Sequence, residues 1–360
     1  MNLTSLGWNA TLDEQFRPYA SKGWVPGRVS RTHGGRCFVL TDAGELLAET
    51  TGRLRHEADG PGGLPAVGDW VAVAARPAEG AATLHAILPR RSCFSREAAG
   101  GGAVEQVVAA NVDTVLLVSG LDGDFNLRRI ERYLTLAYSS GAVPVIVLNK
   151  ADLCDDVDAR VGQVETVACA VPVHPLSAAA GDGLDALHAY LKPGRTVALL
   201  GSSGVGKSTL INALLGFERQ AVRAVRADDS RGRHTTTCRE LIPLPTGALL
   251  VDTPGLRELR LWGDDEGLSG AFADVEALAA RCRFRDCAHR DEPGCAVQAA
   301  LADGTLDAAR FESYLRLGRE LRHLEAKQQR KVRLAEKARW KKLCKLQQEL
   351  GKARRRAGRR

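Results

Sequence analysis

The clearest chemistry in the sequence belongs to the glycine-rich run GSSGVGKS at residues 201–208. Glycines let a backbone wrap around phosphate groups, and the amides at the start of a following helix attract negative charge. Lys207 is expected to reach the β- and γ-phosphates of a nucleotide, and Ser208 to hold Mg²⁺. A predicted strand at 196–200 and a predicted helix at 207–215 flank the run, which favours a phosphate site over a chance turn. The expected nucleotide-binding residues of this loop are Gly201, Ser202, Ser203, Gly204, Val205, Gly206, Lys207, Ser208 and Thr209.

A second group of residues predicts which base the nucleotide carries. Asn149, Lys150 and Asp152 follow a predicted strand at 143–148, where open α/β sheets bind ligands. Asp152 can accept two hydrogen bonds from guanine that adenine cannot offer, and a site built for such bonds rejects the analogue lacking them. We expect Asn149 to support the loop and the stem of Lys150 to cover the base. Ser177 and Ala178, after the next predicted strand, suit a backbone contact to guanine O6, so the expected ligand is GTP or GDP.

The segment Asp252-Thr-Pro-Gly255 follows a further predicted strand at 248–251. Asp252 can occupy the outer coordination shell of the magnesium ion, and the Gly255 amide can contact the γ-phosphate. Alone this segment would be weak evidence, but after a phosphate loop and a strand it indicates an element that responds to the γ-phosphate.

The run GRHTTT at 232–237 lies between these two elements and predicts the other nucleotide-sensitive loop. A threonine here would bind Mg²⁺ only when the γ-phosphate is present, and Thr236 is our candidate. Leu256 stands where many GTPases place a water-orienting glutamine, and an aliphatic side chain cannot position water. We therefore expect slow intrinsic hydrolysis, helped by His234 or by a partner, although His234 fits a locally packed loop histidine equally well.

Three cysteines and one histidine form a tight cluster, Cys282, Cys287, His289 and Cys295. Soft sulfur with imidazole nitrogen, four ligands and no spare carboxylate predict one structural, tetrahedral Zn²⁺ site. Buried free cysteines beside a surface histidine are the alternative, which such close clustering of thiols disfavours. The other six cysteines show no such grouping and are interpreted as ordinary packing or surface residues.

Charge is concentrated at the C-terminal end of the chain. The 360 residues carry a net charge of +7, but residues 319–360 hold 17 Lys and Arg against 4 Asp and Glu, so the remainder is negative. A concentrated cationic segment favours a polyanionic partner such as nucleic acid, with a merely solvated helix as the alternative. No apolar run approaches a membrane span and no leader is recognisable, so we expect a cytoplasmic protein without membrane attachment.

The periodicity predicts a multidomain chain. Short alternating runs between about residues 25 and 89 predict an N-terminal β-barrel, with an OB-fold as the natural candidate and an SH3-like barrel as the alternative. Buried strands alternating with helices then predict a parallel sheet. The expected units are a barrel at 1–98, a GTPase α/β domain at 99–262, a helical zinc-binding domain at 263–330 and a basic tail at 331–360, where a long helix frays into the terminal arginines. The guanine-binding loop precedes the phosphate loop, which reverses the usual order and indicates circular permutation.

Together these residues resemble the circularly permuted ribosome small-subunit-dependent GTPase A family. The similarity includes the motifs quoted above and Leu6-Gly-Trp8, Pro26-Gly-Arg-Val29, Val67-Gly-Asp-Trp70 and Glu105–Asp113, and it covers nearly the whole chain apart from the tail. It implies an OB barrel, a permuted GTPase core, a zinc-binding helical domain and GTP-dependent binding to the small ribosomal subunit and its rRNA. Hydrolysis would be stimulated by that subunit and would drive release.

Two other functions stay open at this stage. The chain could be a non-catalytic RNA-binding module that uses GTP as a structural ligand. It could also be a GTPase of a metal-delivery or tRNA-modification system, although the closed zinc pattern and the lack of a second active-site motif speak against this. The leading interpretation is a monomeric GTP hydrolase (EC 3.6.1.-) with a slow intrinsic rate that its partner stimulates.

Overall fold

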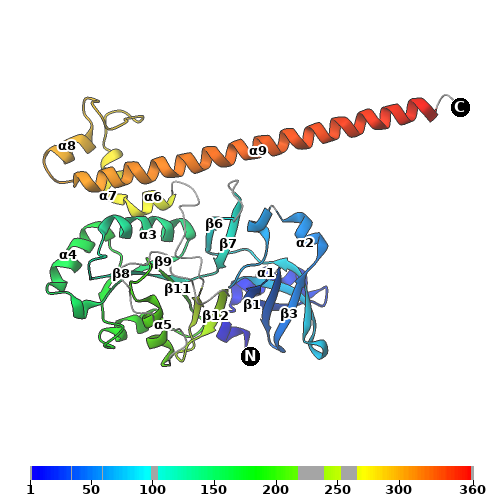
Figure 1. Cartoon of the computed structure of the whole chain (residues 1–360), viewed down its shortest axis with the longest axis horizontal. Coiled ribbons are helices and arrows are strands. Elements are labelled where there is room, and N and C mark those ends of the chain that lie inside the picture. Colours follow the sequence, from blue (N-terminus) through cyan, green and yellow to red (C-terminus); the bar gives the residue numbers. More distant parts are fainter. Residues whose placement is uncertain are drawn as a thin grey trace.

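A barrel, an α/β domain and a helical C-terminal part follow one another along the chain (Figure 1). The computed structural model describes residues 2–33, 35–58, 60–98, 104–217, 239–252 and 266–357. Of the expected site residues, Thr236, His234 and Gly255 lie outside the described residues, as does Leu256. None of the helices in these described ranges combines the length and apolarity that crossing a membrane requires.

The N-terminal barrel has five strands that close on themselves in the order β1-β2-β3-β5-β4, with β4 pairing back to β1. Its interior contains alternate residues of these strands, including Val29, Val39, Leu46, Val71 and Leu84. The closed Greek-key arrangement is OB-like and confirms the predicted barrel. Its elements are α1 (Ala10–Ala20), β1 (Val25–His33), β2 (Arg36–Thr41), β3 (Gly44–Thr50), α2 (Gly52–Glu57), β4 (Trp70–Arg76) and β5 (Ala81–Ile87), with short 3-10 helices at Leu3–Leu6, Gly60–Gly63 and Pro77–Glu79.

A two-stranded antiparallel hairpin, β6 (Cys93–Glu97) with β7 (Glu105–Ala110), links the barrel to the central domain. The sequence pattern did not predict this hairpin.

The central domain is built on a sheet in the order β10-β9-β8-β11-β13-β12, in which β12 is antiparallel to β13 and the other neighbours are parallel. Successive side chains of a strand point to opposite faces, so Val115 and Leu117 of β8 pack on the side of α3 and α4, while Leu116 and Val118 pack on the side of α5. The elements are β8 (Thr114–Gly120), α3 (Leu127–Ser140), β9 (Val143–Asn149), α4 (Val157–Ala168), β10 (Val173–Pro175), β11 (Thr196–Leu200), α5 (Lys207–Leu215), β12 (Arg239–Pro243) and β13 (Leu249–Asp252), with 3-10 helices at Ala151–Leu153 and Leu184–Ala189.

The barrel and the central sheet are joined by backbone and side-chain contacts. Strand β12 pairs with β1 of the barrel, Arg31 opposite Glu240, so the two sheets are continuous. Arg28, 1% exposed, donates to Thr196 Oγ1 at 2.8 Å and to the carbonyl oxygens of Gly68 and Asn111 at 3.3 and 3.2 Å. Burial lowers the pKa of Arg28 to about 10, an effect that the nearby carboxylates of Asp113 and Asp69 partly oppose.

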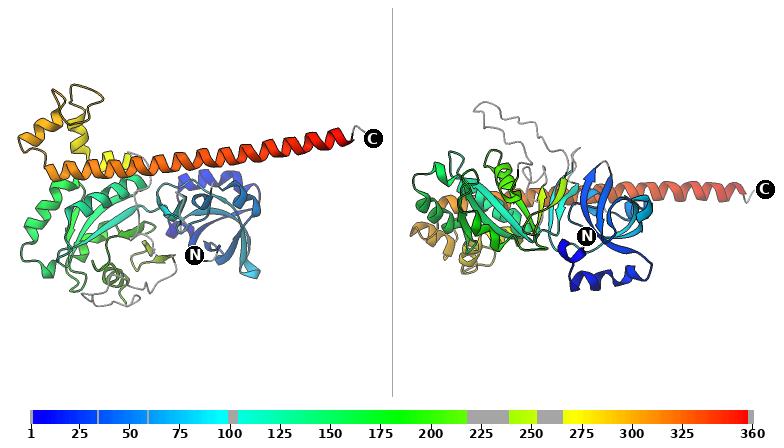
Figure 2. Two further views of the ribbon diagram at one scale, coloured as in Figure 1. Left: turned by 45° about the horizontal axis from the view of Figure 1, so that its top comes forward. Right: turned by 90° about the horizontal axis from the view of Figure 1, so that it is seen from below.

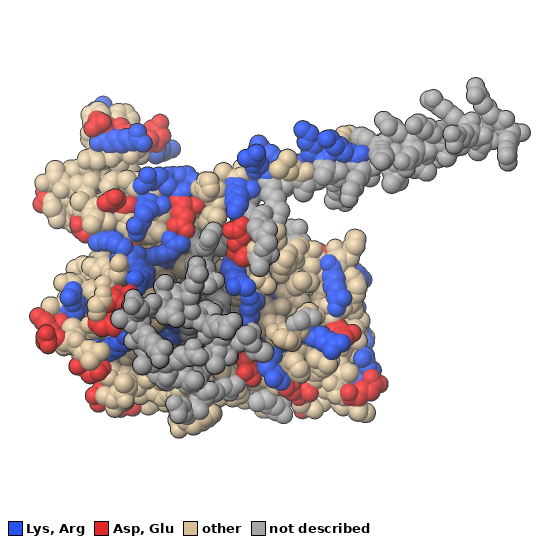
Figure 3. Space-filling model, in the orientation of Figure 1, with Lys and Arg blue, Asp and Glu red and all other residues tan. Residues whose placement is uncertain are grey.

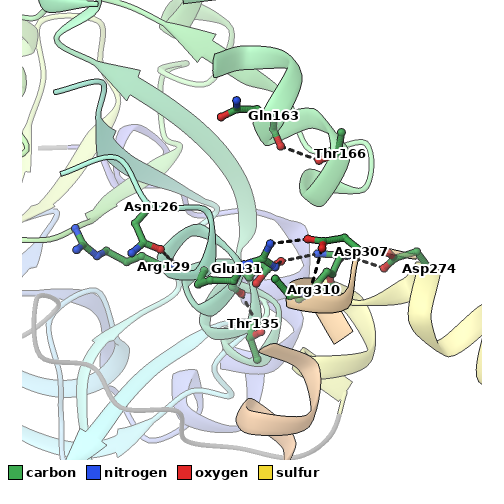
Figure 4. Close-up of polar contacts among 12 residues, drawn as sticks. Asn126, Arg129, Glu131, Thr135, Gln163, Thr166, Asp274, Asp307 and Arg310 are labelled. Atoms are coloured by element: carbon green, nitrogen blue, oxygen red, sulfur yellow. Dashed lines mark hydrogen bonds and ion pairs between the residues drawn. The ribbon is translucent and has the colours of Figure 1, made fainter. Parts of the chain in front are cut away.

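The C-terminal helices form a further layer over α3 (Figures 1 and 2). Gly267 allows the close approach of α6 to α3, because a Cβ there would lie 1.8 Å from Ser139 Oγ and 2.7 Å from the carbonyl oxygen of Thr135. Arg310 of α9 joins this helix to α3 and α7. It is 3% exposed and contacts Glu131 of α3 and Asp274 of α7 (Figure 4). The elements are α6 (Glu266–Ala271), α7 (Ala273–Ala279), α8 (Ala296–Ala302) and α9 (Ala308–Ala357).

Helix α9 leaves the body after its first turns and passes the β6–β7 hairpin, where Lys327 Nζ lies 2.8 Å from Glu97 Oε1. It then projects beyond the barrel (Figure 2). The last two arginines of the segment expected to fray, Arg359 and Arg360, lie outside the described residues, while helix α9 continues through Arg354–Arg356 to Ala357. Its composition of Ala, Leu, Lys, Arg, Gln and Glu explains this, since these are the strongest helix formers.

Candidate functional site

The phosphate loop joins β11 to α5, as the sequence analysis predicted. Lys207 is the first residue of α5 and is 7% exposed. Its Nζ donates to the carbonyl oxygen of Gly201 at 2.6 Å and also to that of Ser202. Gly206 precedes the helix with a φ of +93°, a left-handed conformation that glycine adopts at little cost. The loop amides and the start of α5 therefore form a site suited to an anion.

Asn149 connects the phosphate loop to both loops of the predicted guanine site. It is 2% exposed, and its Nδ2 donates to the carbonyl oxygen of Val205 at 2.8 Å. Its Oδ1 accepts from the backbone amide of Ala178 at 2.9 Å. A Cβ at Gly206 would lie 2.2 Å from this Nδ2, so the contact also requires a glycine there. One amide side chain thus fixes the spacing between the predicted base site and the predicted phosphate site.

The carboxyl ends of β9 and β10 border a pocket of about 350 Å³. Asp152, Leu176 and Ser177 are among its lining residues, together with Asp182 and Gly183 of the loop that follows. The Ser177 amide donates to the carbonyl oxygen of Asp182 at 3.0 Å, which closes this loop on itself. The structure therefore brings together Asp152 and Ser177, the two sides of the predicted guanine site.

A polar loop after β8 also lies against the site, and the sequence analysis did not predict it. Asp122 Oδ2 lies 2.5 Å from Lys150 Nζ. Asp124 Oδ2 accepts from Ser202 Oγ at 2.7 Å and from Arg129 Nη1 at 2.5 Å. Partial burial acts to raise the pKa of Asp124, but the hydrogen bonds from Arg129 and Ser202 outweigh it and hold the pKa below its usual value.

The signal that could have identified this loop is its place at the carboxyl end of β8, which pairs with β11 directly beside the phosphate loop. Asp252, at the end of β13, occupies the corresponding position on the other side of β11. Its main-chain partner in the sheet is Glu240 of β12. Ser208, the second residue of α5, and Asp252, at the end of β13, carry oxygen ligands of the kind that Mg²⁺ prefers.

The four predicted metal ligands converge, with all their ligand atoms within 4.8 Å of one another. Cys282 Sγ lies 3.8 Å from Cys295 Sγ, and His289 Nδ1 lies 3.6 and 3.5 Å from these two sulfurs. A tetrahedron with Zn–S bonds of 2.3 Å has sulfur–sulfur edges of about 3.8 Å, so the cluster fits Zn²⁺. Gln298 Nε2 donates to the carbonyl oxygen of His289 at 2.6 Å, which orients the histidine backbone.

Comparison with known proteins identifies the family. The RsgA GTPase family model matches residues 87–262. A protein of Opitutus terrae named small ribosomal subunit biogenesis GTPase RsgA is 53% identical over 352 residues, which are 95% of this chain and 96% of that protein. A Methanosarcina acetivorans protein of the same name is 48% identical and covers 94% of this chain and 90% of its own length. The chain belongs to the RsgA GTPase family.

Two solved structures have a similar fold. The crystal structure of YjeQ from Thermotoga maritima is similar with a TM-score of 0.63 and 29% identity, over 83% of this chain and 98% of that one. YloQ, described as a circularly permuted GTPase, is similar in fold with a TM-score of 0.60 and 24% identity, over 83% and 96% of the two chains. The predicted family and the predicted architecture of barrel, permuted GTPase core and helical region with a Cys/His cluster are confirmed.

Proposed function

We propose that this protein is a GTP hydrolase that binds the small ribosomal subunit late in its maturation, is stimulated by that subunit and leaves after hydrolysis. The observation that carries the proposal is Asn149, which links the phosphate loop to Ala178 of the base site in permuted chain order. This geometry occurs in a chain 53% identical to a small ribosomal subunit biogenesis GTPase. We propose that the protein is located in the cytoplasm and acts there as a monomer.

The proposed roles of the site residues follow from their chemistry. Lys207 would exchange its carbonyl partners for the β- and γ-phosphates, and Ser208 would hold Mg²⁺ with Asp252 in its outer shell. Bound Mg²⁺ neutralises charge on the phosphate oxygens. Asp152 would accept from guanine, and the Ser177–Ala178 backbone would contact guanine O6. Asn149 would support the loop, and the stem of Lys150 would cover the base. Catalysis would consist of positioning and electrostatic stabilisation, without a covalent intermediate.

Three residues of the proposed mechanism lie outside the described part of the chain. We propose that Thr236 completes the magnesium shell, that the Gly255 amide contacts the γ-phosphate, and that His234 helps to orient the attacking water. The aliphatic Leu256 supports the slow intrinsic rate, since it cannot position water itself.

The cysteine cluster would hold one structural Zn²⁺ in the C-terminal part. Three thiolates and one imidazole fill a tetrahedral shell, so the metal would stabilise the fold around α8 and would not bind substrate. Because Cys295 also caps α8 through the Gln298 amide, at 3.4 Å, the metal and the start of this helix are coupled.

The proposed RNA contacts are the barrel and the free half of α9. Lys and Arg side chains line the described part of α9 where it leaves the body (Figure 3). Between residues 327 and 357 the helix carries 13 Lys and Arg against 2 Asp and Glu. Such a density of cations favours a phosphate backbone. The division at residues 98, 262 and 330 is part of this proposal, with the last boundary falling inside α9.

The deciding experiment is GTP turnover by the full chain with and without purified small subunits. Faster turnover with subunits supports the proposal. Equally slow turnover in both conditions, with GTP still bound, would favour the non-catalytic RNA-binding alternative.

A further inference from the structure

The second residue of the phosphate loop is held from two directions. The carbonyl oxygen of Ser202 accepts a hydrogen bond from Lys207 Nζ. Its hydroxyl donates to Asp124 Oδ2 at 2.7 Å and accepts from Arg129 Nη1 at 2.9 Å. If Lys207 releases the Ser202 carbonyl when it binds phosphate, the contacts of the Ser202 hydroxyl to Asp124 and Arg129 remain.

Arg129 comes from helix α3, and Asp124 comes from the loop that precedes it. Arg129 lies in the first turn of α3, where Asn126 caps the helix by accepting from the Arg129 amide at 3.1 Å. Figure 4 shows that the Arg129 side chain extends to the side opposite Glu131, which contacts Arg310. Arg129 is therefore separate from the contacts that dock the C-terminal helices on α3.

The same loop reaches the base side of the site. Asp122 Oδ1 accepts from the Asp124 amide at 3.2 Å, and Asp122 Oδ2 pairs with Lys150 Nζ. A chain of contacts thus runs from Lys150 through Asp122 and Asp124 to Ser202. Because one loop contacts both halves of the nucleotide site, it can fix their separation independently of Asn149.

We propose that Arg129 and Asp124 are positioning residues that hold the phosphate loop in its nucleotide-binding conformation through the Ser202 hydroxyl. This inference rests on the proposed GTP site and deepens it. Arg129 and Asp124 have opposite charges and pair with each other, so their joint effect on a phosphate is geometric and not a net attraction. The side chains of both are about one-third exposed, at 31% and 39%, so the expected effect is moderate.

The test is GDP affinity of the full chain, measured by calorimetry for Arg129→Ala, Ser202→Ala and the double variant. We expect each single variant to weaken binding roughly fivefold to tenfold. The double variant should bind no more weakly than Ser202→Ala alone, because Ser202→Ala already removes the contact to Arg129. Arg129→Lys should restore part of the loss, since an ammonium can donate to the same hydroxyl. Arg132→Ala, one turn further along α3 and paired with Glu320, is the matched control and should bind GDP as the wild type does.

Asp124→Asn separates positioning from direct attraction. If the pair positions the loop, this variant also weakens GDP binding, because it removes the ion pair that orients Arg129 and replaces a charge-assisted hydrogen bond to Ser202 with a weaker neutral one. Tighter binding by Asp124→Asn would mean that Arg129 attracts phosphate directly, and additive losses in the double variant would mean that it does not act through Ser202; either result overturns the inference. A wild-type chain that fails to bind GDP would instead refute the proposed function.

Discussion

The buried arginine of α9 offers a sharp test of how the C-terminal part is attached. The Arg310 side chain is 4% exposed and contacts Glu131, whose side chain is fully buried, at 3.1 Å. It also contacts Asp274, whose side chain is 38% exposed, at 2.6 Å. We expect Arg310→Met to destabilise the docking of α9 and α7 on α3, because it leaves a buried carboxylate without this cation.

The size of the effect follows from burial. Removing one partner of a buried ion pair costs about 3–5 kcal/mol. Asp274 is partly solvated and contributes little to that cost. Glu131 keeps Arg128 at 2.5 Å, although its Oε2 has no hydrogen-bond partner among the described residues. We therefore expect a loss of docking free energy at the lower end of this range, about 3 kcal/mol. This corresponds to roughly a 100-fold shift in the docking equilibrium.

Hydrogen exchange of the amides in α3 and in the first turns of α9 measures this equilibrium directly, and urea unfolding followed by circular dichroism measures the global loss. Arg316→Met, an exposed position on the same helix, is the matched control. The double variant Arg310→Met/Glu131→Gln should recover part of the lost docking stability, because it removes the buried negative charge that Glu131 would retain without Arg310. If Arg310→Met exchanges no faster than Arg316→Met, the buried pair gives no net stabilisation and the reasoning is wrong.

Further predictions concern the base site, the metal, the projecting helix and pH. Asp152→Asn should weaken GTP binding about 100-fold or more, because two charge-assisted hydrogen bonds are lost, and calorimetry with GTP and ATP would detect it; unchanged GTP affinity would remove Asp152 from the base site. Cys295→Ser should lower bound zinc from one ion per chain to nearly none by mass spectrometry under native conditions, and an equal zinc content in both proteins would contradict the site. Trp340→Ala, at a position 69% exposed on the basic part of α9, should weaken small-subunit binding severalfold while basal hydrolysis stays the same. Deleting residues 352–360 should flatten the salt dependence of that binding, and an unchanged slope would make these residues incidental. Burial of the Asp274 carboxylate acts to raise its pKa, but the hydrogen bonds from Arg310 outweigh burial and hold the pKa below its usual value. The contribution of Asp274 to docking is therefore complete above about pH 4 and is lost as pH falls through the folded pKa. Protection of the α7 amides, corrected for the intrinsic pH dependence of exchange, that does not fall on acidification would contradict this.

Local patterns predicted the individual elements well, and the reason is the strength of each local signal. The strand at 196–200 and the helix at 207–215 agree with β11 and α5, because an apolar run, a glycine-rich turn and an amphipathic run follow each other there. The four zinc ligands were identifiable because they lie close together in the chain.

What the sequence could not supply is the order of strands within the sheet. The contact of Arg129 with Ser202 spans 73 positions, and it exists because β8 pairs with β11. Nothing in the spacing of Asp122, Asp124 and Arg129 predicts that pairing. The β6–β7 hairpin was missed for a related reason, since its strands flank residues rich in glycine and alanine and lack a compact turn motif.

The continuous sheet across β1 and β12 has a consequence for recognition of a large partner. With Arg28 buried at the same junction, the barrel cannot swivel against the nucleotide site without breaking main-chain pairs and exposing a cation. The barrel and the nucleotide site are therefore held at a fixed distance and orientation. A large partner that contacts both the barrel and the nucleotide domain must therefore present its two contact surfaces at the matching spacing, and a partner with another spacing would contact only one of the two domains.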